Sequence, residues 1–136
     1  MRTPSLVTLA VFATASFLSG CGGMMPSTAG EDAPTMTMNS SAGAILTDHR
    51  GMTLYTYDPD QTGLSACTGL CAAAWPPVFA RPSATATGHL SVIARADGSP
   101  QWALDGKPLY TYQADKKPGD IKGDGVDGVW HLVRPE

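Results

Sequence analysis

Hydrophobic positions follow two patterns along the chain, and the first is an unbroken apolar run near its start. Residues 5–20 are uncharged and rich in Leu, Val, Phe and Ala, and they follow a short positive end at Met1-Arg2. A membrane-spanning helix needs about 20 predominantly apolar residues. The shorter run is typical of a signal peptide, so residues 1–20 are expected to be set aside from the folded domain.

Beyond residue 42 the pattern changes to short segments in which apolar and polar side chains alternate, which predicts β-strands. The tetrapeptide Leu-Tyr-Thr-Tyr occurs at 54–57 and again at 109–112. On a strand its Leu and Thr face one side and its two tyrosines the other. Strands are predicted at 44–48, 52–58, 90–96, 101–104, 109–113 and 128–133, with turns at 49–51, 97–98 and 105–106. One short helix is predicted within 67–74, ended by Pro76-Pro77.

The alternating segments form an internal repeat. A shift of 55 residues aligns eight identical residues without a gap, namely Gly51/Gly106, Leu54/Leu109, Tyr55/Tyr110, Thr56/Thr111, Tyr57/Tyr112, Asp60/Asp115, Trp75/Trp130 and Val78/Val133. Two copies predict a compact domain rather than a solenoid. The expected fold is mainly β, a small antiparallel sheet or barrel-like domain built from two pseudo-symmetric repeats with one short helix. The domain is expected over 43–136, with repeat one at about 44–80 and repeat two at about 100–135.

The segment between the apolar run and the domain has the composition of a tether. Residues 21–42 are mainly Gly, Ser, Thr, Met and Pro, which predicts a flexible linker. Its four methionines are soft ligands for copper, although an ordinary linker composition is the favoured interpretation. They are Met24, Met25, Met36 and Met38.

Residues 18–21, Leu-Ser-Gly-Cys, resemble the bacterial lipobox, in which small residues precede a cysteine that becomes the acylated N-terminus. The resemblance implies a lipid on Cys21 and a partner membrane. Two or more acyl chains hold a protein firmly, whereas one binds marginally. Gly22, rather than Asp, implies the outer membrane if the host is Gram-negative. The expected location is therefore the cell envelope, facing the periplasm in such a host.

Residues 55–60 and 110–115 each consist of Tyr, any residue, an aromatic residue, two further residues and Asp. Together with the 67–77 and 117–131 blocks, this pattern resembles a family of predicted secreted bacterial lipoproteins with tandem repeats of unknown function. The family carries a Tyr-x-(Phe/Trp/Tyr)-x-x-Asp motif, and the resemblance covers nearly all of residues 44–135. It implies a secreted location and no particular activity.

The repeat-motif residues are Tyr55, Tyr57, Asp60, Tyr110, Tyr112 and Asp115. Aromatic side chains on strands supply buried area and cross-strand pairing, which is the favoured role of the tyrosines. The alternative role is ligand binding, since paired aromatic faces can also stack on a sugar, a quinone or the edge of a haem. The two aspartates follow strand ends, where Asp commonly bonds the backbone of a turn. A catalytic carboxylate pair is the alternative.

Cys67 and Cys71 lie one helical turn apart, and in an oxidising compartment such a pair usually forms a disulfide. The alternative is a copper site that combines both cysteines with a histidine. Weak candidates for that third ligand are His49, His89 and His131. Asp120, Asp124 and Asp127 in a Gly-rich loop are calcium candidates, although their spacing does not match an EF-hand and a surface loop is favoured.

The net charge and the lack of known catalytic motifs reduce the number of function classes that the sequence supports. The formal net charge is −3 and no basic patch is visible, so a nucleic-acid partner is not expected. Nucleophile-elbow, phosphate-loop and His-Glu-x-x-His motifs are missing, so the chain is not expected to be an enzyme. The leading hypothesis is a lipid-anchored, non-catalytic binding or structural module without a cofactor, its partner an unknown envelope protein or small ligand. The alternatives are a copper-binding or electron-transfer accessory protein using Cys67 and Cys71, and an envelope enzyme using Asp60 and Asp115.

Overall fold

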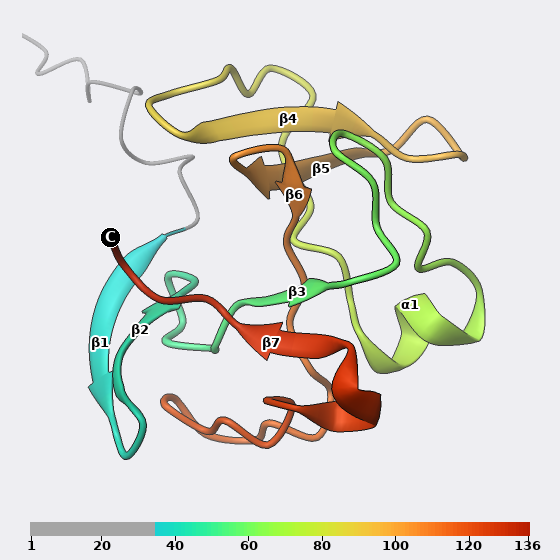
Figure 1. The fold of residues 1–136 in the computed structure, drawn as a ribbon. Helices are drawn as coiled ribbons and strands as arrows, with labels where there is room; N and C mark the ends of the chain where they lie inside the picture. Colours follow the sequence, from blue (N-terminus) through green and yellow to red (C-terminus); the bar gives the residue numbers. More distant parts are fainter. Residues whose placement is uncertain (1–34) are drawn as a thin grey trace, which may run out of the picture.

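The computed structural model describes residues 35–136, and nearly all of its regular structure is β (Figure 1). Its strands are β1 (Met36–Ser40), β2 (Gly43–Thr47), β3 (Tyr55–Tyr57), β4 (Leu90–Ala94), β5 (Pro100–Leu104), β6 (Lys107–Pro108) and β7 (Trp130–Leu132). The helices are α1 (Leu70–Ala74) and the single 3₁₀ turn η1 (Val126–Gly128). The predicted helix therefore exists but is shorter than expected. It ends before Pro76-Pro77, which cannot continue it.

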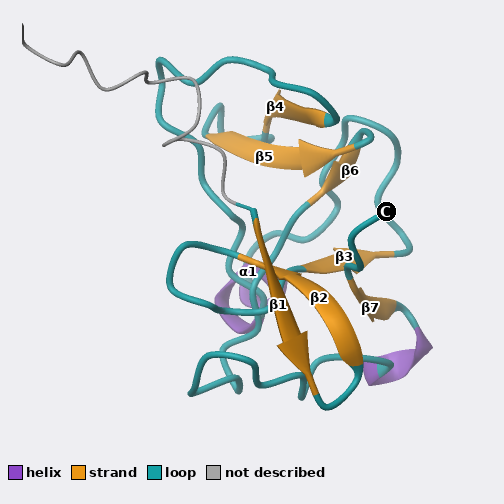
Figure 2. Cartoon of the chain, turned by 90° about the vertical axis from the view of Figure 1, so that its left-hand side faces the viewer, coloured by secondary structure: helices purple, strands orange, loops and turns teal. Residues whose placement is uncertain are grey.

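The strands form three small antiparallel sheets, β1-β2, β3-β7 and β4-β5-β6. Figure 2 shows these sheets as separate short ribbons joined by long loops. They do not close on one another, so the barrel-like part of the prediction is wrong although the mainly β, antiparallel class is confirmed. Strands of two to five residues are too short to curl into a continuous wall.

The first strand lies inside the segment expected to be linker. β1 pairs with β2 along its whole length, from Met36 opposite Thr47 to Ser40 opposite Gly43. Ordered structure therefore begins at least seven residues before the expected domain start at residue 43. The polar residues Thr37, Asn39 and Ser40 make this strand resemble a tether in composition, because it is an edge strand with one face in water.

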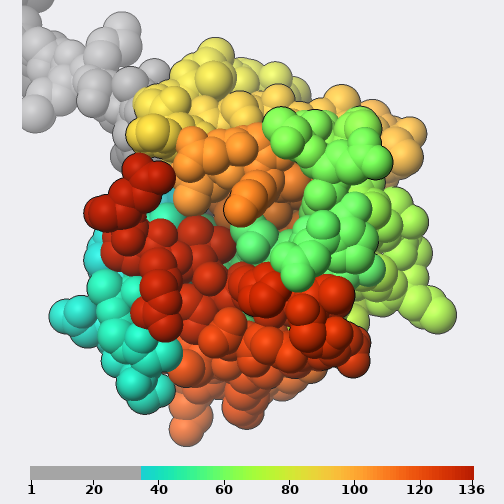
Figure 3. Space-filling model, viewed as in Figure 1, coloured from blue at the N-terminus to red at the C-terminus, as the bar shows by residue number. Residues whose placement is uncertain are grey.

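The two repeats are interlocked rather than stacked side by side. Strand β3 of repeat one pairs with β7 of repeat two, with Thr56 opposite His131. In the reciprocal position, Tyr110 forms a bridge to Pro77 of repeat one. The amides and carbonyls of Tyr55 and Tyr110 bond each other at 2.8 and 3.0 Å, so these equivalent residues meet where the repeats cross. Figure 3 shows the resulting surface, with the red C-terminal segment packed against the much earlier cyan and green segments.

This crossing changes the strand pairing expected from the sequence. The predicted hairpin of 44–48 with 52–58 is reduced to a bridge between Thr47 and Thr53, because β3 takes β7 as its partner. The predicted strand at 109–113 is likewise only a bridge at Tyr110. Partners from the other repeat satisfy backbone groups that a local hairpin would otherwise pair.

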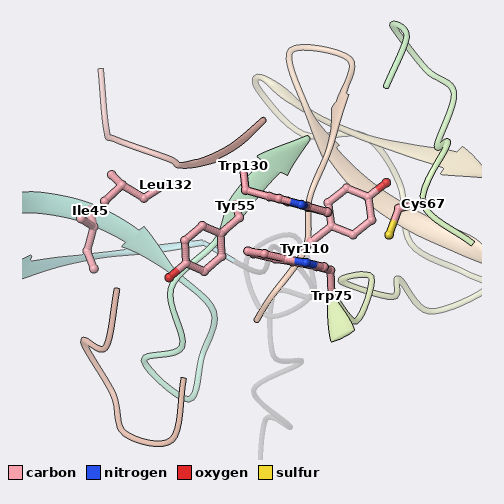
Figure 4. Packing of buried hydrophobic residues seen from close by; sticks show 7 residues of the cluster. All are labelled: Ile45, Tyr55, Cys67, Trp75, Tyr110, Trp130 and Leu132. Carbon is pink, nitrogen blue, oxygen red and sulfur yellow. The ribbon is translucent and has the colours of Figure 1, made fainter. Parts of the chain in front are cut away.

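Alternation along the Leu-Tyr-Thr-Tyr segments produces two hydrophobic cores on opposite sides of the strands. Tyr55 and Tyr110 are fully buried in one core, whose members are drawn in Figure 4. Leu54 and Leu109 are fully buried in the other, beside Trp102. Both copies of the repeat therefore contribute equivalent residues to both cores.

Candidate functional site

The first tyrosine of each motif donates its phenol hydrogen to the motif aspartate of the other repeat. The Tyr55 hydroxyl donates to Oδ2 of Asp115 at 2.7 Å, and the Tyr110 hydroxyl donates to Oδ2 of Asp60 at 2.7 Å. The remaining carboxylate oxygens accept backbone amides, from Lys122 to Asp115 at 2.9 Å and from Ala66 to Asp60 at 2.6 Å. All six motif residues thus serve to join the repeats or fill the core between them.

The electrostatics of these pairs follow from burial. Removal from water raises the pKa of Tyr110 to about 12, and the adjacent Asp60 carboxylate adds to the effect. Burial likewise raises the pKa of Tyr55 well above its usual value. Burial also raises the pKa of Asp60 and Asp115, although the phenol and amide donors oppose that change. The phenols therefore remain protonated donors at neutral pH.

Four aromatic rings form a continuous stack through the crossing point, in the order Tyr112, Trp75, Trp130, Tyr57. Ring centroids are separated by 4.0, 3.8 and 4.3 Å along the stack, and the two indoles lie within 4° of parallel. Figure 4 shows Trp75 and Trp130 lying one over the other, with Tyr55 and Tyr110 on either side. Trp75 and Trp130 are 5% and 2% exposed, so their flat faces contact protein rather than a ligand.

Cys67 and Cys71 form the disulfide that the sequence favoured, with their α-carbons 5.2 Å apart. It joins the loop that precedes α1 to the first turn of that helix and packs in the first core, where Cys67 is fully buried. With the two sulfur atoms bonded to each other, neither offers the thiolate that a copper site requires.

Arg95 is a buried charged residue that no sequence pattern singles out. Its guanidinium donates to the Cys67 carbonyl at 2.7 Å, to Gln101 Oε1 at 2.8 Å and to Ser65 Oγ at 2.9 Å. Ser65 in turn bonds the Tyr110 hydroxyl at 2.7 Å. The network joins the disulfide loop to the motif pair, but in sequence Arg95 stands next to the Asp97-Gly98 turn and resembles an ordinary solvated side chain.

The three histidines lie in three different surroundings. His49 is exposed and lines a surface groove. His131 approaches Asp58 at 2.9 Å, and His89 approaches Asp105 at 2.7 Å. None of these contacts involves a cysteine.

The remaining sequence candidates occupy strands and turns. Met36 and Met38 are part of β1, and Met38 packs on the first core. Asp120 accepts the amides of Lys116 and Lys117, and Asp124 accepts the amide of Leu132, as loop-forming aspartates do. The predicted lipidation site Cys21 lies outside the described residues, as do Met24 and Met25.

A groove of about 440 Å³ lies on the surface beside the crossing point, and we call it the Arg50–Phe79 groove. Its walls include His49, Arg50, Pro76, Phe79, Arg81 and Trp102. A neighbouring hollow of about 410 Å³ shares Arg50, Pro76 and Thr111 with it and extends it toward Lys116. Phe79 is 58% exposed, an unusual position for a large apolar side chain.

The fold and the crossed pairs define a class of protein, a duplicated and disulfide-bearing β domain whose two repeats are held by reciprocal Tyr–Asp bonds. Two segments, 36–79 and 91–134, match the model of a family described as a secreted repeat of unknown function, and the chain belongs to that family. The second match begins 55 residues after the first. Each match includes the first strand of a leading hairpin, β1 or β4, which the expected repeat bounds of about 44–80 and 100–135 leave out. No curated protein and no solved structure matches the chain.

Membership of a secreted family indicates an extracellular or cell-envelope location. Among the residues that the structure describes, no helix is long and apolar enough to cross a membrane.

Proposed function

We propose that this protein is a lipid-anchored module of the cell envelope that binds its ligand without catalysing a reaction. The observation that supports this role most directly is the crossed pairing of the motif residues. The phenols of Tyr55 and Tyr110 and both motif carboxylates are bonded to protein partners. A catalytic acid or base needs a proton-transfer path to a substrate, whereas these groups join the two repeats.

The Arg50–Phe79 groove is the proposed binding face. Arg50 and Arg81 line a hollow whose apolar wall includes the exposed Phe79. The Arg50 guanidinium is paired with Asp48, which also lines the hollow, at 2.9 and 3.1 Å, so a bound anion would compete with that carboxylate or use the remaining donors of Arg50. Arginine binds carboxylate, phosphate and sulfonate groups through paired donors, and an apolar ring favours contact with a flat, weakly polar surface. The groove therefore fits an anion that carries a planar or apolar portion.

A naphthalene sulfonate has both features and is the probe for this proposal. Its affinity is measured by its fluorescence with the folded protein. We expect Arg50→Ala and Arg81→Ala each to weaken binding about tenfold or more, the loss of about 1.4 kcal/mol or more. Lys107→Ala, which removes an exposed cation of β6, serves as the matched control and should leave affinity unchanged. Equal affinity in all four proteins would reject the groove as the binding face.

The lipid anchor is tested separately. The segment Leu18-Ser19-Gly20-Cys21 supports acylation at Cys21 after export. Metabolic labelling with an acyl probe should mark the wild-type protein and should fail with Cys21→Ala, which should also leave the membrane fraction. A Cys21→Ala protein that is still labelled and still sediments with membranes would exclude the anchor.

A copper role through Cys67 and Cys71 receives no support from the structure, because the disulfide consumes both sulfurs. Thiol counting discriminates between the two states. Freshly purified protein should contain no titratable thiol at these positions, and two thiols that disappear on adding copper would favour the metal role instead.

A further inference from the structure

Two potential metal ligands are fixed side by side at the end of the β4–β5 hairpin. Leu90 pairs with Leu104 in the ladder, and the next residues outward are His89 and Asp105. The Asp105 amide donates to the His89 carbonyl at 2.8 Å, which continues the ladder by one residue. Their side chains meet with Nδ1 of His89 2.7 Å from Oδ1 of Asp105.

Glu136 adds a third ligand from the segment that follows β7. Its Oε2 lies 4.0 Å from Nε2 of His89, and one ligand atom from each of the three residues lies within 4.8 Å of the other two. The side chains of His89, Asp105 and Glu136 are 66%, 50% and 79% exposed, so small rotamer changes can bring them closer.

The repeat shows that the fold itself does not require carboxylates at this place. The residues 55 positions earlier are Arg50 and Arg81, which correspond to Asp105 and Glu136 in the alignment that superimposes the eight identities. Arg50 and Arg81 line one groove, and Asp105 and Glu136 flank one histidine. Equivalent positions of the two repeats therefore carry opposite charges.

We propose that His89, Asp105 and Glu136 form a binding site for a divalent transition-metal ion, with zinc as the simplest occupant. One imidazole nitrogen and two carboxylate oxygens form a donor set that suits Zn²⁺ and Cu²⁺. A tetrahedral zinc ion with ligand distances of about 2.0–2.2 Å separates its donors by about 3.3 Å. An ion bound to Nδ1 of His89 takes the place of the hydrogen between His89 and Asp105, so that pair widens. The Glu136 carboxylate, which lies nearer Nε2, turns toward Nδ1 to reach the same ion. The fourth position remains open to water or to a ligand of a partner.

The experiment is zinc titration of the full-length purified protein by calorimetry, with melting temperature as a second measurement. We expect one zinc ion per chain, and a melting temperature that rises with zinc concentration because the ion binds only the folded form. His89→Ala and Glu136→Gln should each lower zinc affinity at least about tenfold. Asp105→Asn should have the same effect on zinc affinity, and the backbone should not be disturbed because Asn tolerates the positive φ of this turn.

The matched control is His131→Ala. It removes the other exposed histidine that faces an aspartate, Asp58 at 2.9 Å, and leaves the proposed site intact. Unchanged zinc affinity in His131→Ala, with weakened affinity in His89→Ala, would support the site. No binding by the wild-type protein, or equal affinity in wild-type and His89→Ala proteins, would overturn it. These zinc measurements do not depend on Arg50 or Arg81, so this site and the Arg50–Phe79 groove can fail independently.

Discussion

The crossed Tyr–Asp bonds make a quantitative prediction, because the two chemically identical pairs have different surroundings. Tyr55→Phe removes a fully buried hydroxyl that donates to Asp115 and also accepts the Gly123 amide at 3.1 Å. Losing a hydrogen bond to a charged group costs about 1.5–3 kcal/mol, and leaving a buried amide without an acceptor costs about 1–3 kcal/mol. We therefore expect the free energy of unfolding to fall by about 3–5 kcal/mol.

Tyr110→Phe should cost less. Its partners Asp60 and Ser65 are only partly buried, so water can replace the lost hydroxyl. We expect about 1–2 kcal/mol for this variant. The difference between the two substitutions is a better test than either value, because they remove the same atom from equivalent positions of the two repeats.

Urea denaturation followed by tryptophan fluorescence measures both free energies, and a double-mutant cycle identifies the partner. Tyr55→Phe and Asp115→Asn should show a coupling of at least about 1 kcal/mol, since their side chains are bonded. Tyr55→Phe combined with Asp60→Asn, the motif aspartate of its own repeat, should be additive. Coupling within one repeat and additivity between repeats would refute the crossed arrangement.

Three further predictions follow from the same structure. Trp75→Ala and Trp130→Ala should each reduce the free energy of unfolding by about 3–5 kcal/mol, comparable with the whole stability of a small domain, and normally melting variants would contradict the stacked core. Reduction of the Cys67–Cys71 disulfide, whose cysteines are separated by 4 positions in the sequence, should lower the free energy of unfolding by about 2 kcal/mol. The melting temperature should fall on reduction and recover on reoxidation, and an unchanged melting temperature would show that this disulfide does not stabilise the fold. Burial raises the folded-state pKa values of Asp60 and Asp115, so the folded protein binds these protons more tightly than the unfolded chain does. Their contribution to stability should therefore increase as pH falls from 7 through the folded-state pKa values toward the unfolded value of about 3.9. Melting temperature against pH checks this sign, since Asp115→Asn should lose part of the increase, and an unaltered pH profile in that variant would contradict it.

The sequence predicted several local features because they depend on neighbouring residues. Alternation in the Leu-Tyr-Thr-Tyr segments correctly places Leu54 and Tyr55 in different cores. The spacing of Cys67 and Cys71 predicted their disulfide, and Pro76-Pro77 predicted the end of the helix. Strand β1 was not predicted, because its polar, largely exposed residues have the composition of a flexible linker.

Only the tertiary structure decided which repeat supplies the partner of each element. Tyr55 is 60 residues from Asp115 and only five from Asp60, and no local rule selects the distant carboxylate. The buried Arg95, and the approach of Glu136 to His89, likewise depend on where segments cross in space.

The sequence by itself determined the 55-residue spacing of the repeat, the β character of its segments and which residues of the two repeats are equivalent. These features follow from side-chain alternation and residue identity, which are local properties of the chain. The tertiary structure determined the interlocking, because two equal repeats can satisfy their backbone and phenol groups either within themselves or across to each other. The choice of partner rests on which arrangement buries Trp75 against Trp130 and leaves no buried side-chain polar atom of the described region without a hydrogen bond.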